Sequence, residues 1–201
     1  MAFIGLIRHG RTDWNREGRA QGQKDVPLSE EGLAQARIVA ERLGEEEWHA
    51  IYASDLSRAR RTAEMIAERL GIPDIVYDAR LREIGGGRIE GTTESERVAK
   101  WGPEWERLDL DREPPASVAA RGAAFLEELH AREEGRNVLV VGHGAWMKHC
   151  LNALVPDIDT SAPRKNTSVT KIRKSPEGWA CDLYNCAKHL EGREGAEPGE
   201  I

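Results

Sequence analysis

Two short apolar runs, each closed by a histidine beside glycine, constrain the fold of this chain most strongly. Residues 3–10 read FIGLIRHG and residues 137–144 read NVLVVGHG. Short apolar runs that stop at a breaker are typical of buried strands. Open α/β sheets bind their ligands at the carboxyl ends of the strands, so we expect His9 and His143 to share one edge of a sheet.

Further apolar runs alternate with segments of helical periodicity. After Ser29, which can cap a helix, apolar side chains recur at helical spacing as far as Leu43. Further helices are expected after a cap at Ser54 or Asp55 and after a cap at Ser117. Strands that alternate with helices predict an α/β fold with a largely parallel sheet. The remaining strands are expected at residues 51–53, 74–78, 168–173 and 179–184, the last two forming a hairpin.

The composition is that of a single globular domain. The chain of 201 residues is 39% hydrophobic and 32% charged, and its formal net charge of -6 argues against a nucleic-acid-binding protein. No apolar run approaches the roughly 20 residues of a membrane span, and residues 1–7 do not resemble a signal peptide, so we expect a cytoplasmic protein without a membrane partner. The domain is expected to cover residues 1–201, with a lid-like insertion at about 84–116 and a polar tail from about 192.

The sequence carries no signature of a metal or nucleotide site. Cys150, Cys181 and Cys186 lack CxxC spacing, and we expect them to be buried free thiols. We find no Asp/His cluster with metal-ligand spacing and no GxxxxGK[ST] phosphate loop. The expected chemistry therefore uses no metal and no other cofactor.

Basic residues at the predicted sheet edge favour phosphoryl chemistry. Right-handed crossovers collect the strand-to-helix loops at one edge, where Arg8 and Arg58 would join the two histidines. The planar fork of arginine matches the oxygens of a phosphoryl group, while one histidine can act as nucleophile and the other as electrostatic stabiliser. Glu83, just beyond the third strand, is the candidate acid and base. An ion pair of Glu83 with Arg80 or Arg82 is the alternative.

A series of ordered blocks covers nearly the whole chain. The blocks are LIRHGRTDWN at 6–15, Gly22, VPLSEEG at 26–32, SDLSRA with Thr62 at 54–62, LREI at 81–84, VGHG at 141–144 and NTSV at 166–169. Together they resemble the histidine phosphatase superfamily, phosphoglycerate mutase-like branch. The resemblance implies a three-layer α/β/α fold around a six-stranded, mostly parallel sheet with one antiparallel strand at its edge.

The resemblance also implies roles for five residues. His9 would become phosphorylated, and Arg8, Arg58 and His143 would surround the phosphate. Glu83 would be the proton donor. These roles agree with the chemistry that the residue types themselves favour.

Further residues are implied to contact the phosphate or the substrate. They are Asn15 and the segment around Gln21 and Gly22. Arg11 stands where the family often has Glu or Gln, which would make the entrance more positive. Residues 85–91 read GGGRIEG, whereas the family usually shows an aromatic or aliphatic residue, glycine, an acidic residue and tryptophan. Both departures concern the substrate rather than the phosphate chemistry.

The expected function is that of a metal-independent, histidine acid phosphatase-type phosphomonoesterase. It would hydrolyse a small phosphorylated metabolite through phosphohistidine. One alternative is a cofactor-dependent phosphoglycerate mutase, although the glycine-rich loop and short lid favour water access and hence hydrolysis. A non-catalytic phosphate-binding regulatory module is the third reading, and the presence of both histidines and both arginines argues against it.

Overall fold

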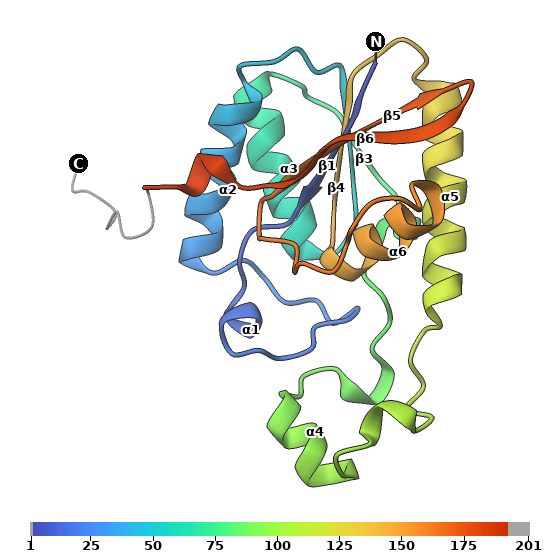
Figure 1. Cartoon of the computed structure of the whole chain (residues 1–201). Coiled ribbons are helices and arrows are strands. Elements are labelled where there is room, and N and C mark those ends of the chain that lie inside the picture. The colour runs from blue at the N-terminus through green and yellow to red at the C-terminus, as the bar shows by residue number, and fades with distance from the viewer. Residues whose placement is uncertain (1, 193–201) are drawn as a thin grey trace, which may run out of the picture.

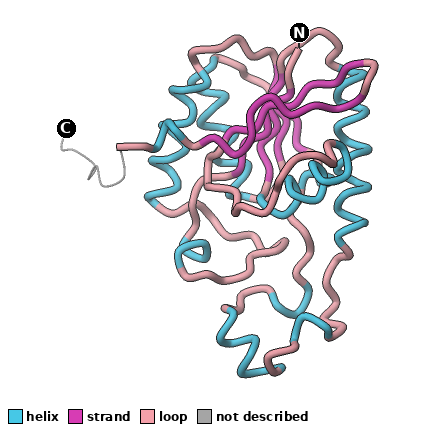
Figure 2. The backbone as a smooth tube through the Cα atoms, viewed as in Figure 1, coloured by secondary structure: helices cyan, strands magenta, loops and turns pink. Residues whose placement is uncertain are grey.

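A six-stranded sheet runs through the centre of the molecule (Figures 1 and 2). The computed structural model describes residues 2–192, and the tail expected from about 192 lies almost wholly outside them. The strand order is β3-β2-β4-β1-β5-β6. The strands are β1 (Ile4–Arg8), β2 (Ala50–Ala53), β3 (Ile75–Tyr77), β4 (Val138–Gly142), β5 (Val169–Ser175) and β6 (Gly178–Cys186).

The sheet is mostly parallel, as expected. Strands β3, β2, β4 and β1 pair in parallel, whereas β5 pairs antiparallel with both β1 and β6. The expected hairpin is present, with Ser175 paired to Gly178 at its turn. The antiparallel strand β5 was expected at the edge of the sheet, but β6 lies outside it, because the hairpin adds two strands on the same side.

Helices cover both faces of the sheet, which confirms the three-layer architecture. Figure 1 shows α2 and α3 on one face and α5 and α6 on the other. Side chains of β1 alternate between the two cores, so that Leu6 packs with the α5–α6 core and Ile7 with the α2–α3 core. The helices are α1 (Asp13–Arg16), α2 (Glu30–Leu43), α3 (Ser57–Leu70), α4 (Glu94–Trp101), α5 (Pro115–Arg132) and α6 (Gly144–Leu154).

The central strands β1 and β4 place the two glycine-flanked histidines side by side. Every residue of β4 is buried, which is typical of a parallel strand covered by helices on both faces. The parallel register pairs Arg8 with Gly142. His9 directly follows β1 and His143 directly follows β4, so both histidines lie at the carboxyl edge of the sheet.

The helix starts agree with the sequence in one case and differ in two. Ser29 caps α2, with its side chain accepting a hydrogen bond from the Gly32 amide. Neither Ser54 nor Asp55 caps α3, because Ser54 contacts His143 and Asp55 pairs with Arg82. Helix α5 begins before Ser117, at Pro115, because the fixed φ of proline suits the first helical position; Pro114 precedes it in an extended conformation.

The segment expected as a lid carries helix α4 and lies below the sheet in Figure 1, on the same side as α1. Its buried apolar side chains are Trp105, which is 5% exposed, and Leu110, and the guanidinium groups of Arg97 and Arg112 contact the Trp105 ring. Backbone hydrogen bonds from Ala20 to Thr92 and from Gly91 to Ala20 join the segment to the loop after α1. The lid segment is therefore tied to the loop that follows the first strand.

The three cysteines are free thiols, but only one is fully buried. Cys150 lies in the α5–α6 core, where burial raises the pKa of its thiol to about 12. Cys181 and Cys186 are half-buried, so the expectation of burial was wrong for them. None of the helices in residues 2–192 has the length and apolar character to cross a membrane.

The contact of α5 with α6 yields a prediction for stability. A Cβ on Gly122 would lie 1.9 Å from the Cys150 sulfur and 3.0 Å from the Trp146 indole nitrogen. We expect Gly122→Ala to lower the free energy of unfolding by about 1–3 kcal/mol, as overpacking does. The Gly122→Ala/Cys150→Ala double variant lacks the sulfur. Its loss of unfolding free energy should therefore be about 1 kcal/mol smaller than the sum of the losses in the two single variants. Urea denaturation of the four proteins measures this, and strictly additive effects would contradict it.

Candidate active site

The imidazole of His9 is held with one ring nitrogen free. His9 is 2% exposed, and its Nδ1 lies 2.7 Å from the carbonyl oxygen of Gly10. A carbonyl can only accept a hydrogen bond, so Nδ1 carries the proton and Nε2 keeps its lone pair in the neutral ring. Burial, together with the nearby charges of Arg58 and Arg8, holds the pKa of His9 well below its ordinary value. The ring is therefore neutral near pH 7 and presents a nucleophilic nitrogen.

The second imidazole, His143, lies next to the first. The two ring centroids are 5.2 Å apart, and His143 is completely buried at the start of α6. Its Nε2 lies 2.9 Å from the Ser54 hydroxyl, while its Nδ1 has no hydrogen-bond partner among residues 2–192. Burial and then the charge of Arg58 lower the pKa of His143 well below its ordinary value. An anion at Nδ1 would favour the protonated ring.

Arg58 is fully buried in the first turn of α3. Its Nη1 donates to the carbonyl of Lys24 and its Nη2 to the carbonyl of Gly22, both at 2.8 Å. Burial lowers its pKa to about 10, so the side chain remains charged near neutral pH. Both hydrogen bonds go to the loop joined to the lid segment, and they fix the orientation of the guanidinium plane.

Arg8 approaches the same point from the end of β1. Its Nη1 donates to the carbonyl of Arg164. A Cβ on Gly144 would lie 3.3 Å from the Arg8 Nε, so the glycine that follows His143 leaves room for the guanidinium group. Burial lowers the pKa of Arg8 from its ordinary value, and Glu83 opposes that effect.

Three buried nitrogens of this cluster have no hydrogen-bond partner within residues 2–192. They are Nε of Arg8, Nε of Arg58 and Nδ1 of His143. An unpaired buried polar group costs about 1–3 kcal/mol, so three together need an explanation. The arrangement suits an anion that accepts hydrogen bonds from all three.

Glu83 completes the cluster with a negative charge. Its Oε1 accepts hydrogen bonds from the amides of Trp146 at 2.7 Å and Ile84 at 3.0 Å, and its Oε2 accepts one from Ala145 at 3.1 Å. Two of these donors are amides of the first turn of α6, which have no partner within the helix. The carboxyl group therefore lies at the start of the helix that follows His143.

The alternative role of Glu83 as an ion-pair partner is not what the structure shows. Arg80 pairs with Asp78 and Glu128, and Arg82 pairs with Asp55. The charge of Glu83 instead raises the pKa values of Arg8 and Arg58, opposing the effect of their burial.

Three other residues predicted to bind substrate, Asn15, Gln21 and Arg11, differ in their hydrogen-bond partners and in their exposure. The side-chain amide of Asn166 donates hydrogen bonds to Asn15 Oδ1 and to the carbonyl oxygen of His9. Gln21 is buried, and its Oε1 has no partner in the described chain. The Arg11 guanidinium pairs with Glu31, and the Arg11 side chain is 39% exposed.

Sequence reasoning missed one side chain that contacts the cluster. Ser54 is a partner of His143, although the sequence suggested a helix cap. Its position gave a usable signal, because Ser54 directly follows β2 at the same sheet edge as His9. Within residues 2–192, no three His, Cys, Asp or Glu side chains are grouped closely enough to hold a metal ion.

Comparisons with known proteins agree with this combination of fold and cluster. The model of the histidine phosphatase superfamily (branch 1) matches residues 4–187. The chain is 32% identical over 198 residues to a metal-independent phosphoserine phosphatase of Arabidopsis thaliana, covering 93% of this chain and 82% of the relative. It is 36% identical over 209 residues to a probable phosphoglycerate mutase of Enterobacter sp., covering 95% and 96%.

A solved structure extends the comparison to the fold. The complex of a mycobacterial glucosyl-3-phosphoglycerate phosphatase with VO3 has a TM-score of 0.84 and 30% sequence identity, covering 93% of this chain and all of that chain. The family model and these relatives thus support a phosphatase of the phosphoglycerate mutase-like kind. The chain belongs to the histidine phosphatase superfamily, branch 1.

The electrostatics of the cluster yield a prediction for the histidines. In phosphate-free buffer, we expect both His9 and His143 to stay neutral well below pH 6.5, their ordinary pKa. Inorganic phosphate should raise the pKa of His143, because the anion favours the imidazolium form. The measurement is an NMR titration of ¹⁵N-labelled imidazoles, assigned with single histidine variants.

The same shift sets the sign of a pH effect on stability. A histidine whose pKa is lower in the folded chain takes up its proton first in the unfolded chain. The free energy of unfolding should therefore fall as the pH drops below about 6.5. A titration midpoint of His9 at or above its ordinary value in the free enzyme would contradict the account.

Proposed function

We propose that the chain is a phosphomonoesterase in which His9 carries the phosphoryl group between two half-reactions. One observation carries the proposal most directly. A neutral His9 with its lone pair on Nε2 lies beside His143, Arg58 and Arg8, and three buried nitrogens of those side chains have no hydrogen-bond partner among residues 2–192. Such nitrogens can donate to the three equatorial oxygens of a phosphoryl group during in-line transfer.

In the first half-reaction His9 Nε2 attacks phosphorus. The P–N bond forms as the ester P–O bond breaks, and the bonding electrons leave with the ester oxygen. The Glu83 carboxyl group protonates that oxygen, so the product departs as a neutral alcohol. Arg8, Arg58 and a protonated His143 stabilise the charge on the phosphoryl oxygens.

In the second half-reaction water takes the place of the alcohol. The Glu83 carboxylate accepts a proton from water as the water oxygen attacks phosphorus. The P–N bond breaks, its electrons return to His9 Nε2, and orthophosphate leaves. The sum is ester plus water to alcohol plus orthophosphate, with Glu83 restored to its protonated form.

We propose that the substrate is a small phosphorylated metabolite. Two relatives support this class by name, a phosphoserine phosphatase and a glucosyl-3-phosphoglycerate phosphatase. Glu90 of the lid segment accepts a hydrogen bond from the backbone amide of Gln23, in the loop that holds Arg58. The organic part of the substrate would therefore extend toward the lid segment. Arg88 is exposed on the lid segment and is our candidate for contact with that part.

A mutase is the second candidate, supported by the relative named as a probable phosphoglycerate mutase. The two activities share the first half-reaction and differ in whether water or a bound phosphoglycerate receives the phosphoryl group. Hydrolysis is favoured by the short glycine-rich loop after Glu83, which leaves water access to the site. Mutase turnover with a bisphosphoglycerate primer exceeding phosphate release would reverse this assignment.

The proposal predicts the behaviour of a His9→Ala variant. Phosphate release from a panel of phosphomonoesters, assayed with EDTA and without added metal, should fall by at least about 10³-fold, since the variant has no nucleophile. Rapid quenching of the wild-type enzyme with ³²P-labelled substrate should give an acid-labile, base-stable phosphoprotein that the variant lacks.

Two control variants accompany this experiment. His130→Ala removes a histidine that packs against Trp179, and it should leave turnover unchanged. Arg88→Ala should alter the order of substrate preference but keep hydrolysis. Undiminished phosphate release by His9→Ala would refute the covalent route.

A further inference from the structure

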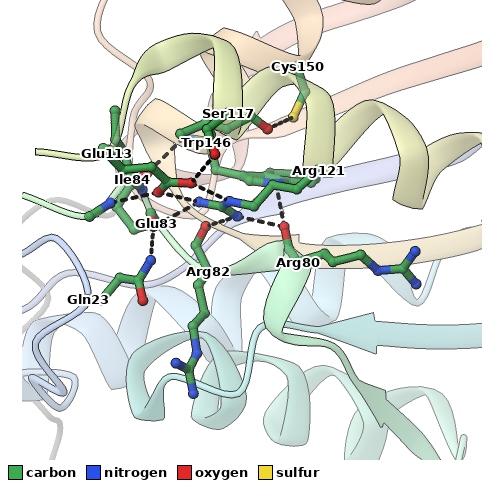
Figure 3. Close-up of polar contacts among 12 residues, drawn as sticks. Gln23, Arg80, Arg82, Glu83, Ile84, Glu113, Ser117, Arg121, Trp146 and Cys150 are labelled. Carbon is green, nitrogen blue, oxygen red and sulfur yellow. Dashed lines mark hydrogen bonds and ion pairs between the residues drawn. The ribbon is translucent and has the colours of Figure 1, made fainter.

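Arg121, on α5, makes a set of hydrogen bonds that the proposed chemistry does not use directly. Its Nη1 donates to the carbonyl oxygens of Arg80 and Arg82, both at 2.6 Å, and its Nη2 donates to that of Glu83 at 3.0 Å (Figure 3). The side chain is 18% exposed. One guanidinium group thus binds three main-chain carbonyls of the segment that presents the Glu83 carboxyl group.

Glu113 orients this guanidinium group. The Nε of Arg121 lies 2.9 Å from Glu113 Oε1, and its Nη2 lies 3.1 Å from Oε2 (Figure 3). Glu113 Oε2 also accepts a hydrogen bond from the Gly85 amide at 2.9 Å, and the Glu113 amide donates to the Gly85 carbonyl at 2.8 Å. The pair therefore fixes the two ends of the lid segment to each other and to α5.

These contacts fix Glu83 at both of its ends. Its carboxyl group is held by the amides of the α6 start, and its carbonyl oxygen accepts hydrogen bonds from Arg121 and from Gln23 at 3.2 Å. The indole of Trp146 donates to the Arg80 carbonyl at 2.9 Å, so α6 holds the same segment. A shift of the 80–83 backbone would move the carboxyl group relative to the phosphoryl site.

We infer that Arg121, oriented by Glu113, is a positioning residue for Glu83. The inference rests on the acid–base role of Glu83 in the proposed function. Arg121 contacts no reacting atom and acts by holding the backbone from which the carboxyl group extends. Only arginine supplies five N–H donors in a rigid fork, which here serve five acceptor oxygens at once, so lysine cannot replace it.

This role differs in a measurable way from general stabilisation of the fold. A misplaced Glu83 protonates the leaving oxygen poorly, which slows the departure of an alkoxide far more than that of p-nitrophenolate. A merely structural role would slow both substrates alike. The value of kcat/KM isolates the difference, because it reports the steps up to departure of the leaving group.

The experiment compares phosphoserine with p-nitrophenyl phosphate as substrates of the full chain. The variants are Arg121→Lys, Arg121→Gln and Glu113→Gln. Arg132→Gln is the matched control, because Arg132 lies on the same helix and pairs with Glu128 at the surface. Circular dichroism at the assay temperature shows which variants are folded. If phosphoserine is a poor substrate, another alkyl phosphate from the panel takes its place.

In the Arg121 variants we expect kcat/KM for the alkyl phosphate to fall by at least about tenfold, within the range that general acid catalysis supplies. We expect kcat/KM for the aryl phosphate to fall by about threefold or less. Glu113→Gln should show the same selectivity to a smaller extent, and Arg132→Gln none. Equal losses for both substrates in folded Arg121→Lys and Glu113→Gln would overturn the inference. These two variants decide the question if Arg121→Gln does not fold.

Glu83→Gln, measured in parallel, separates this inference from the proposed function. A selective loss for the alkyl phosphate in Glu83→Gln supports the acid role of Glu83. If that loss occurs and the Arg121 variants lack it, the positioning role alone is refuted. An unselective Glu83→Gln refutes the acid role, and the inference fails with it.

Discussion

The burial of two guanidinium groups beside two imidazoles is the constraint on which the rest of the structure depends. Removing a charge from water costs several kcal/mol per ion unless other groups replace the lost hydration. Here the carbonyls of Gly22 and Lys24 serve Arg58, the carbonyl of Arg164 serves Arg8, and Glu83 supplies an opposing charge. Burial, together with the positive charges of Arg58 and Arg8, keeps both histidines neutral, and three buried nitrogens without a partner among residues 2–192 remain for an anion.

Segments far apart in the sequence meet at this cluster, where each supplies hydrogen-bond donors or acceptors to another segment. The loop that follows α1 accepts hydrogen bonds from Arg58 and is joined to the lid segment. The first amides of α6 donate hydrogen bonds to the Glu83 carboxyl group. Arg121 then supplies donors for three carbonyls just before the lid. The lid segment, Glu83 and the cluster around His9 therefore belong to one connected network of hydrogen bonds, which links the ends of the lid segment to the position of Glu83.

The sequence predicted those parts of the site that depend on strand ends. His9 and His143 follow two buried strands, and parallel strands end at the same edge, so their proximity could be deduced before the structure was known. The cap at Ser54 was predicted wrongly because α3 begins only at Ser57, with Leu56 at the N-cap position, and the contact of the Ser54 hydroxyl with His143 is visible only in the folded structure. The role of Arg121 was not visible either, because it binds main-chain carbonyls, and no side-chain pattern records where a carbonyl points.

The most direct test of phosphoryl transfer to His9 is an experimental structure of this protein with vanadate, whose five-coordinate form resembles a phosphoryl group during transfer. We expect vanadium bonded to His9 Nε2, equatorial oxygens hydrogen-bonded to Arg8 Nε, Arg58 Nε and His143 Nδ1, and an axial oxygen facing Glu83. Vanadate bound away from His9, or with those three nitrogens still lacking partners, would contradict it.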